Sequence, residues 1–329
     1  MNKIEFGDCR ETMRKWAAEG VKVQTCVTSP PYFGLRDYGH EGQIGLEQTP
    51  EQYIAAMVEV FRCVKDVLAD DGTLWLNIGD SYASGGRKTR DPGQSKLHPA
   101  FTGEANATTS FRPDDGEGVK PKDLIGIPWM LAFALRADGW YLRQDIIWHK
   151  PNPMPESVRD RCTKAHEYIF LLSKSERYFF NSEAMQEPAT GRDPGNVTPH
   201  KHAGERFAET KANLASVGAR ETRNRRSVWT VATKPYKGAH FATFPTALIE
   251  PCILAGSRPN DIVLDPFMGS GTTAAVAIQH GRQYLGCELN PEYGALQEQR
   301  LQTPIKPKKV VTTDRCTKTV DLFGKHHDL

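Results

Sequence analysis

The 329-residue sequence lacks both a long apolar run and a basic N-terminal region followed by an apolar stretch. A membrane-spanning helix needs about 18 consecutive apolar residues, so the first absence excludes one. The second absence excludes a secretory signal. We therefore expect a cytoplasmic protein that has no membrane partner.

Cysteine pairs at short spacing are also missing. The seven cysteines stand at positions 9, 26, 63, 162, 252, 287 and 316, without any Cys-x-x-Cys. An odd, scattered set of this kind makes neither a disulfide framework nor a zinc site. We therefore expect a reducing compartment and no bound metal.

A strong net charge is absent, because 42 basic side chains face 40 acidic ones and leave a charge of +2. The distribution is nevertheless uneven. Residues 190–237 hold ten Lys or Arg against four acidic residues. A basic segment on a mildly acidic body is typical of a protein that binds a polyanion, although a solvated loop without a partner has the same composition.

Short apolar strands alternate with amphipathic helices at both ends of the chain, which predicts an α/β fold with a mostly parallel sheet covered by helices on both faces. The clearest helix begins at Thr49-Pro50 and continues to Leu68 with apolar residues at the 3.6-residue period. Asp70-Asp71-Gly72 predicts a turn into the next strand. The expected strands are 3–6, 21–28, 73–78, 141–148, 167–172, 261–264 and 283–287.

A glycine-rich corner follows the expected strand 261–264, with the sequence Asp265-Pro-Phe-Met-Gly269-Ser-Gly271-Thr-Thr. With Ala274 it satisfies a dinucleotide-binding fingerprint, so a nicotinamide-dependent dehydrogenase is one interpretation. No Lys follows Gly271, and Asp265 would repel a pyrophosphate. The cationic S-adenosylmethionine fits better, with Glu288 placed to accept from its ribose hydroxyls. A plain strand-turn-helix with a surface Glu is the alternative without a ligand.

The position of this corner indicates an unusual chain order. Only about 60 residues follow Asp265, too few for the further βα units that the sheet needs. The N-terminal strands are therefore expected to complete the sheet, with the cofactor half encoded last. This order is a circular permutation of the usual Rossmann-like arrangement.

A second corner, Ser29-Pro30-Pro31-Tyr32, follows the expected strand 21–28. Two prolines fix the backbone and remove two donors, so the nearby carbonyls can accept hydrogen bonds from a ligand. Ser29 and one such carbonyl could hold an exocyclic amine, and Tyr32 could stack on a base swung out of the duplex. A polyproline turn at a strand end is the alternative.

Asp8 lies just after the first expected strand, where an acid could accept from an adenine amine or a ribose. It could equally cap the helix that follows.

These residues together resemble the amino-methylating DNA methyltransferases of the permuted, beta-type order, in their Ser-Pro-Pro-Tyr form. The likeness covers most of residues 1–302 and includes the segments Trp148–Pro155 and His166–Phe170. It implies that Ser29, Pro30, Pro31 and Tyr32 are catalytic. It implies S-adenosylmethionine binding by Asp8, Pro245, Asp265, Phe267, Gly269, Gly271, Thr272, Thr273 and Glu288. It implies DNA contacts by Lys150, Arg223, Arg225 and Arg226.

The resemblance also implies a division of the chain. Residues 1–186 would form the catalytic half with a loop insertion at 83–122, and residues 238–302 the cofactor half. Residues 187–237 would recognise the target. Residues 303–329 would be a flexible tail, in which Thr319-Val-Asp-Leu-Phe323 is similar to a peptide that docks on the sliding clamp.

The expected activity is site-specific methylation of double-stranded DNA with base flipping, as in restriction-modification, where a cognate restriction endonuclease is a possible partner. Ser rather than Asp at position 29 points by resemblance to N4 of cytosine. N6 of adenine, on the same fold, is the alternative. A non-catalytic DNA-binding protein on this scaffold is a further one.

Overall fold

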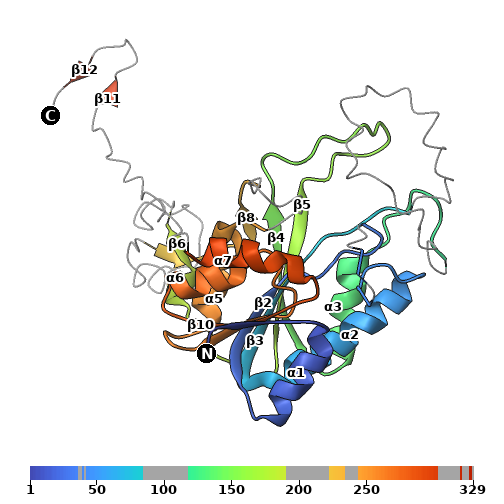
Figure 1. Cartoon of the computed structure of the whole chain (residues 1–329). Coiled ribbons are helices and arrows are strands. Elements are labelled where there is room, and N and C mark those ends of the chain that lie inside the picture. Colours follow the sequence, from blue (N-terminus) through green and yellow to red (C-terminus); the bar gives the residue numbers. More distant parts are fainter. Residues whose placement is uncertain are drawn as a thin grey trace, which may run out of the picture.

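The computed structural model describes residues 1–35, 39–40, 42–83, 118–189, 222–233 and 244–302, and the backbone of 319–320 and 326–327. Within these residues an eight-stranded sheet has the order β1-β10-β9-β2-β3-β5-β4-β8 (Figure 1). Its strands are β1 (Lys3–Phe6), β2 (Val23–Thr28), β3 (Leu68–Ile78), β4 (Tyr141–His149), β5 (His166–Ser173), β8 (Val228–Thr230), β9 (Ile262–Asp265) and β10 (Gln283–Glu288).

The strands are mostly parallel. From β1 through β10, β9 and β2 to β3 each pair is parallel, β5 runs antiparallel to both β3 and β4, and β8 is parallel to β4. The late strands β9 and β10 lie between the early strands β1 and β2. The two ends of the described fold therefore complete one sheet, as the sequence predicts.

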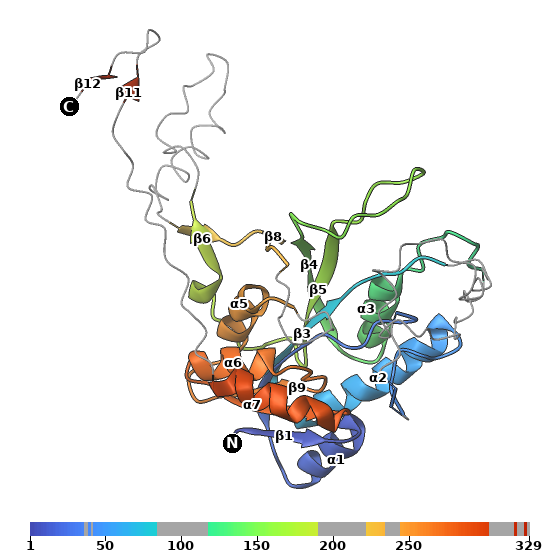
Figure 2. The same ribbon diagram turned by 45° about the horizontal axis from the view of Figure 1, so that its top comes forward.

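Helices cover both faces of the sheet (Figure 2). One layer contains α1 (Cys9–Ala18), α2 (Pro50–Val67) and α3 (Ile127–Ala137), and the other contains α5 (Thr246–Gly256), α6 (Thr272–Gln279) and α7 (Gly294–Gln302). Short 3-10 turns span Glu183–Met185 and Pro291–Tyr293. No helix in the described part of the chain is both long and apolar enough to cross a membrane.

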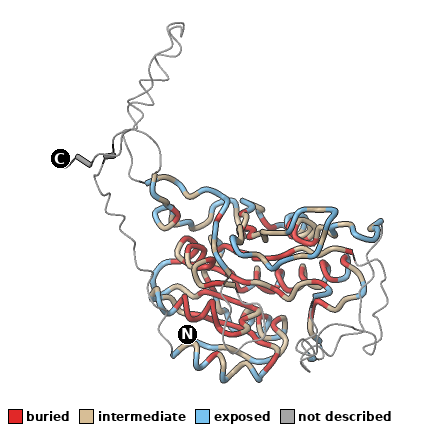
Figure 3. The backbone as a smooth tube through the Cα atoms, turned by 90° about the horizontal axis from the view of Figure 1, so that it is seen from above, coloured by how far each residue is buried: buried red, intermediate tan, exposed pale blue. Residues whose placement is uncertain are grey.

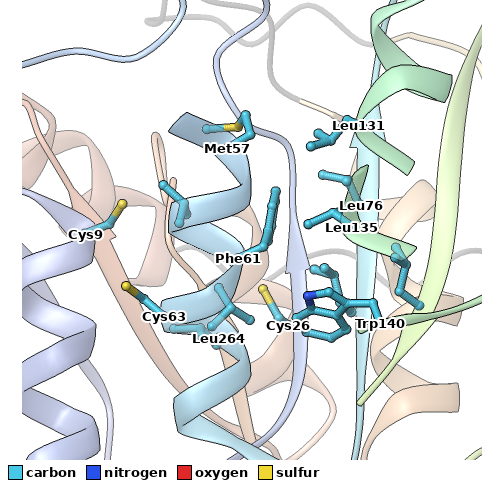
Figure 4. Packing of buried hydrophobic residues seen from close by; sticks show 14 of the residues in the cluster. Cys9, Cys26, Met57, Phe61, Cys63, Leu76, Leu131, Leu135, Trp140 and Leu264 are labelled. Carbon is cyan, nitrogen blue, oxygen red and sulfur yellow. The ribbon is translucent and has the colours of Figure 1, made fainter. Parts of the chain in front are cut away.

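Two hydrophobic clusters, one on each face, hold the layers together. Along β3, Leu74 and Leu76 enter the cluster beneath α1, α2 and α3, whereas Trp75 enters the cluster beneath α5 and α6. Successive side chains of a strand point to opposite faces, so a strand buried on both sides is apolar throughout. Figure 3 shows the buried layers, and Figure 4 shows Phe61 and Leu131 within the first cluster.

The expected helix at 49–68 is confirmed as α2. Thr49 caps it, because its side chain accepts a hydrogen bond from the Gln52 backbone N–H, and Pro50 occupies the first turn. One expectation beside it is wrong: Asp70-Asp71-Gly72 does not precede the next strand but lies inside β3. Leu68 already pairs with Val23, and the register then jumps to the pair Thr73 and Thr25. Pairing at Leu68 keeps the chain in the sheet, and the acidic pair forms a bulge.

The remaining strand predictions are right to within two residues. Three short strands lie at the ends of the basic region. There β8 joins the main sheet, and β6 (Gln186–Pro188) pairs with β7 (Thr222–Asn224). Most of the predicted loop 83–122, of the basic region and of the tail lies outside the described residues. In the tail, β11 (Thr319–Val320) pairs with β12 (His326–His327), and the rest of the clamp-like peptide is outside the description.

Candidate active site at the switch point of the sheet

The centre of the sheet is a topological switch point. From β9 the chain crosses through α6 to β10 on one side, whereas from β2 it crosses through α2 to β3 on the other side. The carboxyl ends of β9 and β2 lie next to each other, since Leu264 pairs with Cys26 in parallel. Open α/β sheets bind their ligands in the crevice at such a point.

Asp265 joins the two predicted corners directly. Its carboxylate is 1% exposed and accepts hydrogen bonds from the Thr28 hydroxyl at 2.6 Å and from the Thr273 hydroxyl at 2.6 Å. A third bond comes from the Phe267 backbone N–H at 3.0 Å. Burial raises the pKa of Asp265 to about 6, and the hydroxyl hydrogen bonds limit the rise.

The glycine turn after Asp265 needs glycine at two positions. Gly269 has a φ of +52° and Gly271 a φ of +82°, a region that L side chains rarely adopt. The Gly269 N–H donates to Glu288 at 2.7 Å, and the Gln297 side chain donates to the Gly269 carbonyl at 2.8 Å. Glu288 and Gln297 thus hold the turn through its backbone.

Glu288 is nearly buried at the end of β10. Its second carboxylate oxygen accepts from the Asn290 N–H, and burial raises the pKa of the group. Gln297 was not predicted, because a single glutamine on a mostly polar helix gives no sequence signal. Its burial at 3% exposure identifies it in the structure.

Asp8 caps α1, as the second interpretation of this residue predicted. Its carboxylate accepts from the Arg10 backbone N–H at 2.8 Å and pairs with the Arg10 guanidinium at 2.6 Å. These bonds from Arg10 hold the pKa of Asp8 below its usual range. A contact of Asp8 with a cofactor stays a prediction.

Two of the other expected cofactor residues belong to the same corner: Phe267 is half-buried against the first cluster, and Thr272 begins α6 with its side chain buried. Pro245 is the N-cap of α5. Their individual contacts with a cofactor stay predictions.

The Ser29 corner presents oxygen atoms that can accept hydrogen bonds from a ligand. The Tyr53 hydroxyl donates to the Pro31 carbonyl at 2.8 Å, so that carbonyl already has a partner. No described residue donates to the Pro30 carbonyl. Ser29 and the Pro30 carbonyl are therefore the adjacent acceptors that the corner presents.

Tyr32 is held at both ends of its ring. Its hydroxyl donates to Glu167 at 2.8 Å, and its ring edge packs on Gly79, where an added Cβ would lie 2.7 Å from Cε2. Glu167 also accepts from the Asn77 amide at 3.3 Å and forms an ion pair with Lys150. Burial and the Glu167 charge raise the pKa of Tyr32. Lys150, one of the predicted DNA contacts, thus lies in the Tyr32 corner.

The three predicted arginines lie elsewhere. They precede β8, whose Val228 pairs in parallel with Ile147, so they lie toward the amino-terminal end of β4 and away from Lys150. Arg223 and Arg226 both donate to Glu187, at 2.9 and 2.8 Å, and the Arg225 guanidinium stacks over Trp229 at 4.4 Å. The structure therefore does not bring them to the Tyr32 corner, and their role in binding DNA stays a prediction.

Comparison with known proteins decides the family. The family described as DNA methylase, of the N6/N4 type, matches residues 23–299. The chain belongs to this family. The methylase is 51% identical to Type II methyltransferase M.Cfr9I of Citrobacter freundii over 296 residues, which cover 90% of this chain and 86% of that protein. It is 50% identical to Type II methyltransferase M.SmaI of Serratia marcescens, over 91% of this chain and 90% of that protein.

Solved structures share the fold of the methylase. The cytosine-N4-specific PvuII DNA methyltransferase matches with a TM-score of 0.59 and 18% identity, over 93% of this chain and 88% of that one. The M1.HpyAVI complex with S-adenosylmethionine matches with a TM-score of 0.54 and 19% identity, over 92% of this chain and all of that one.

The methylase is thus an S-adenosylmethionine-dependent DNA methyltransferase, and the interpretation as a nicotinamide-dependent dehydrogenase is wrong. The chemistry of the corner fits this cofactor. Acidic groups gather at the carboxyl ends of β1, β9 and β10 as Asp8, Asp265 and Glu288. Such a set favours a sulfonium and an ammonium over a pyrophosphate.

Proposed function

We propose that this methylase transfers the methyl group of S-adenosylmethionine to the exocyclic N4 of cytosine within a short duplex sequence. The proposal rests mainly on Ser29 and the adjacent Pro30 carbonyl beside the cofactor corner. Ser in place of Asp at this position points by resemblance to cytosine, and one relative in fold is named as cytosine-N4-specific.

The chemistry asks for two hydrogen-bond acceptors. The lone pair of a cytosine amine is delocalised into the ring, so the nitrogen is a poor nucleophile. When Ser29 and the Pro30 carbonyl each accept one N–H, the nitrogen can become tetrahedral and direct its lone pair at the methyl carbon. The new C–N bond forms as the C–S bond breaks, and the cationic amine then loses a proton to water.

Tyr32 would hold the target ring. A buried base cannot be methylated within the stack, so the nucleotide must swing out of the duplex. The Glu167 bond and the packing on Gly79 keep the phenol ring in one orientation. A ring fixed in this way can stack on the flipped base without losing further conformational freedom.

The roles at the cofactor corner would be divided. S-adenosylmethionine supplies an electrophilic methyl group when it is bound. Asp265 and Glu288 both accept hydrogen bonds within the protein at each carboxylate oxygen. A carboxylate can accept more than one bond at an oxygen. We therefore infer that both acids position the corner and that Glu288, with the glycine turn, also accepts from the ribose hydroxyls of the cofactor.

The chain order would be the permuted, beta-type one. The glycine corner belongs to residues 265–273 and the Ser29 corner to the N-terminal part, so the cofactor half follows the catalytic half. The target-recognition role of residues 187–237, a partner endonuclease and a clamp contact of the tail remain predictions.

Modification mapping tests the proposal. The methylase is expressed in cells without other DNA methylation, and their DNA is sequenced by a method that detects modified bases. We expect N4-methylcytosine at one short recurrent sequence. N6-methyladenine would replace the cytosine assignment by its alternative on the same fold.

A further inference from the structure

Met154 is the most exposed of the large hydrophobic side chains in the described residues, at 84%. Single exposed apolar residues are common on protein surfaces and need no function by themselves. What distinguishes Met154 is where the chain holds it. It lies on the connection between β4 and β5, which we name the arm and define as residues 150–165.

The arm is stiff around Met154. Pro153 and Pro155 flank it, and a residue before proline is restricted to extended backbone. Asn152 fixes the same stretch to Thr233. The Asn152 side chain donates to the Thr233 carbonyl at 3.2 Å and accepts from the Thr233 N–H at 3.0 Å. The exposure of Met154 therefore belongs to a constrained backbone.

The far part of the arm is braced as well. Glu156 accepts from the Arg161 guanidinium at 2.6 Å and from the Lys164 N–H at 3.2 Å. The Arg161 guanidinium lies 3.8 Å from the centre of the Tyr82 ring. Figures 1 and 2 both show the arm rising past the carboxyl ends of the strands. The arm thus stands as a fixed projection at the edge that carries Ser29.

The base of the arm is part of the Tyr32 corner. Lys150 forms an ion pair with Glu167, and Tyr32 donates to the same carboxylate. Only three residues separate Lys150 from Met154. An apolar side chain therefore projects into solvent four positions after Lys150, which shares the Glu167 carboxylate with Tyr32.

The charge of the arm suits a nucleic acid. Residues 150–165 hold four basic side chains, Lys150, Arg159, Arg161 and Lys164, and two acidic ones, Glu156 and Asp160. The arm therefore has a net charge of +2, although Glu167, just beyond it, pairs with Lys150. Basic side chains position a protein on phosphates, and apolar side chains can then enter between bases. Methionine suits this task, because its thioether is unbranched and polarisable and adapts to a stack of rings.

We propose that Met154 enters the duplex and fills the space that the target base leaves when it swings out. The inference rests on the base flipping in the proposed function, and it applies whether the base is cytosine or adenine. By occupying the gap, Met154 stabilises the open duplex and thereby increases the fraction of complexes ready for methyl transfer.

A pair of DNA substrates tests this role. One is a duplex carrying the site found by modification mapping, and the other is the same duplex without a base opposite the target. Met154→Ala is expected to lower kcat/KM on the paired duplex by about tenfold, since flipping then costs more. On the unpaired substrate the loss should nearly vanish, because extrusion is already easy. Met154→Leu should retain most of the activity.

The control is Ile278→Ala, a truncation of an apolar side chain that is 42% exposed near the carboxyl-terminal end of α6. It should leave both substrates unaffected. Equal rates of Met154→Ala and wild type on the paired duplex would overturn the proposal, and so would an equal loss on both substrates. If the wild-type methylase modifies neither substrate, the proposed function has failed instead. The role of Met154 concerns only the difference in kcat/KM between the two substrates.

Discussion

Thr28 donates a hydrogen bond of 2.6 Å to Asp265, across 237 positions of the sequence. Thr28 is the last residue of β2, directly before Ser29, and Asp265 is the last residue of β9, directly before the glycine turn. One buried contact therefore fixes the spacing between the corner that would hold the amine and the corner that would hold the methyl donor. Correct alignment of two reactants is a large source of catalytic rate.

Replacement of Thr28 by Val tests this contact. Val has a similar shape but no hydroxyl, so Oδ1 of the buried Asp265 loses one of its two donors and keeps only the Phe267 N–H. We expect the free energy of unfolding to fall by about 1–3 kcal/mol and kcat to fall more than cofactor affinity. Thr28→Ser keeps the hydroxyl and should restore kcat. If the kcat of Thr28→Ser is no higher than that of Thr28→Val, the hydrogen bond between Thr28 and Asp265 does not align the two corners.

Ser29→Ala should separate chemistry from binding. The change removes one acceptor for the target amine and leaves the glycine turn intact. We expect kcat to fall by about 100-fold or more, by analogy with the loss of one hydrogen-bonding group at a reaction centre. The affinity for S-adenosylmethionine, measured by calorimetry, should change little. A comparable loss in both quantities would argue against this division of roles.

Asp265 should make stability depend on pH. Its pKa is raised from 3.8 to about 6 in the folded protein, so between these values the folded state holds more protons than the unfolded state. As pH rises from 3.8 to about 6, the free energy of unfolding therefore falls by about 3 kcal/mol because of Asp265.

Asp265→Asn provides the comparison, because the amide oxygen can still accept from Thr28 and Thr273 has the Val27 carbonyl within 3.4 Å as another acceptor. The difference in unfolding free energy, wild type minus variant, should decrease between pH 4 and pH 6.5 in urea titrations. A difference that is constant with pH, or that increases, would contradict the raised pKa.

Glu167→Gln should act through Tyr32 and Lys150. The amide removes the ion pair with Lys150 and weakens the fixation of the Tyr32 ring. We expect a severalfold or larger increase in KM for DNA with little change in cofactor affinity. Glu51→Gln, on the exposed first turn of α2, is the matched control and should behave as the wild type. An equal change in the KM for DNA with both variants would show that the Tyr32 corner does not help to hold DNA.

The sequence predicts the fold well where local patterns decide it. The apolar strands, the capped helix at Thr49 and the glycine turn each carry their own signal, and the late position of Asp265 predicts that the chain ends meet. The bulge at Asp70-Asp71-Gly72 could not be predicted, because the pairing of Leu68 with Val23 comes from a distant strand.

The sequence indicates the motifs of the candidate site but not the residues that hold those motifs in position. Ser29, Tyr32 and Asp265 stand in recognisable patterns, whereas Glu167, Asn77 and Gln297 act through contacts between distant segments. The role of the three arginines in binding DNA stays a prediction. Their position could not be read from composition, because it is the parallel pairing of β8 with β4 that separates them from Lys150.

The most direct test of the account uses purified methylase, unmethylated DNA and S-adenosylmethionine labelled in its methyl group. The DNA is digested to nucleosides, which are separated and identified by mass. The account predicts that the label appears in N4-methylcytosine with the wild type and is nearly absent with Ser29→Ala. Label in N6-methyladenine, or undiminished N4-methylcytosine from Ser29→Ala, would contradict it.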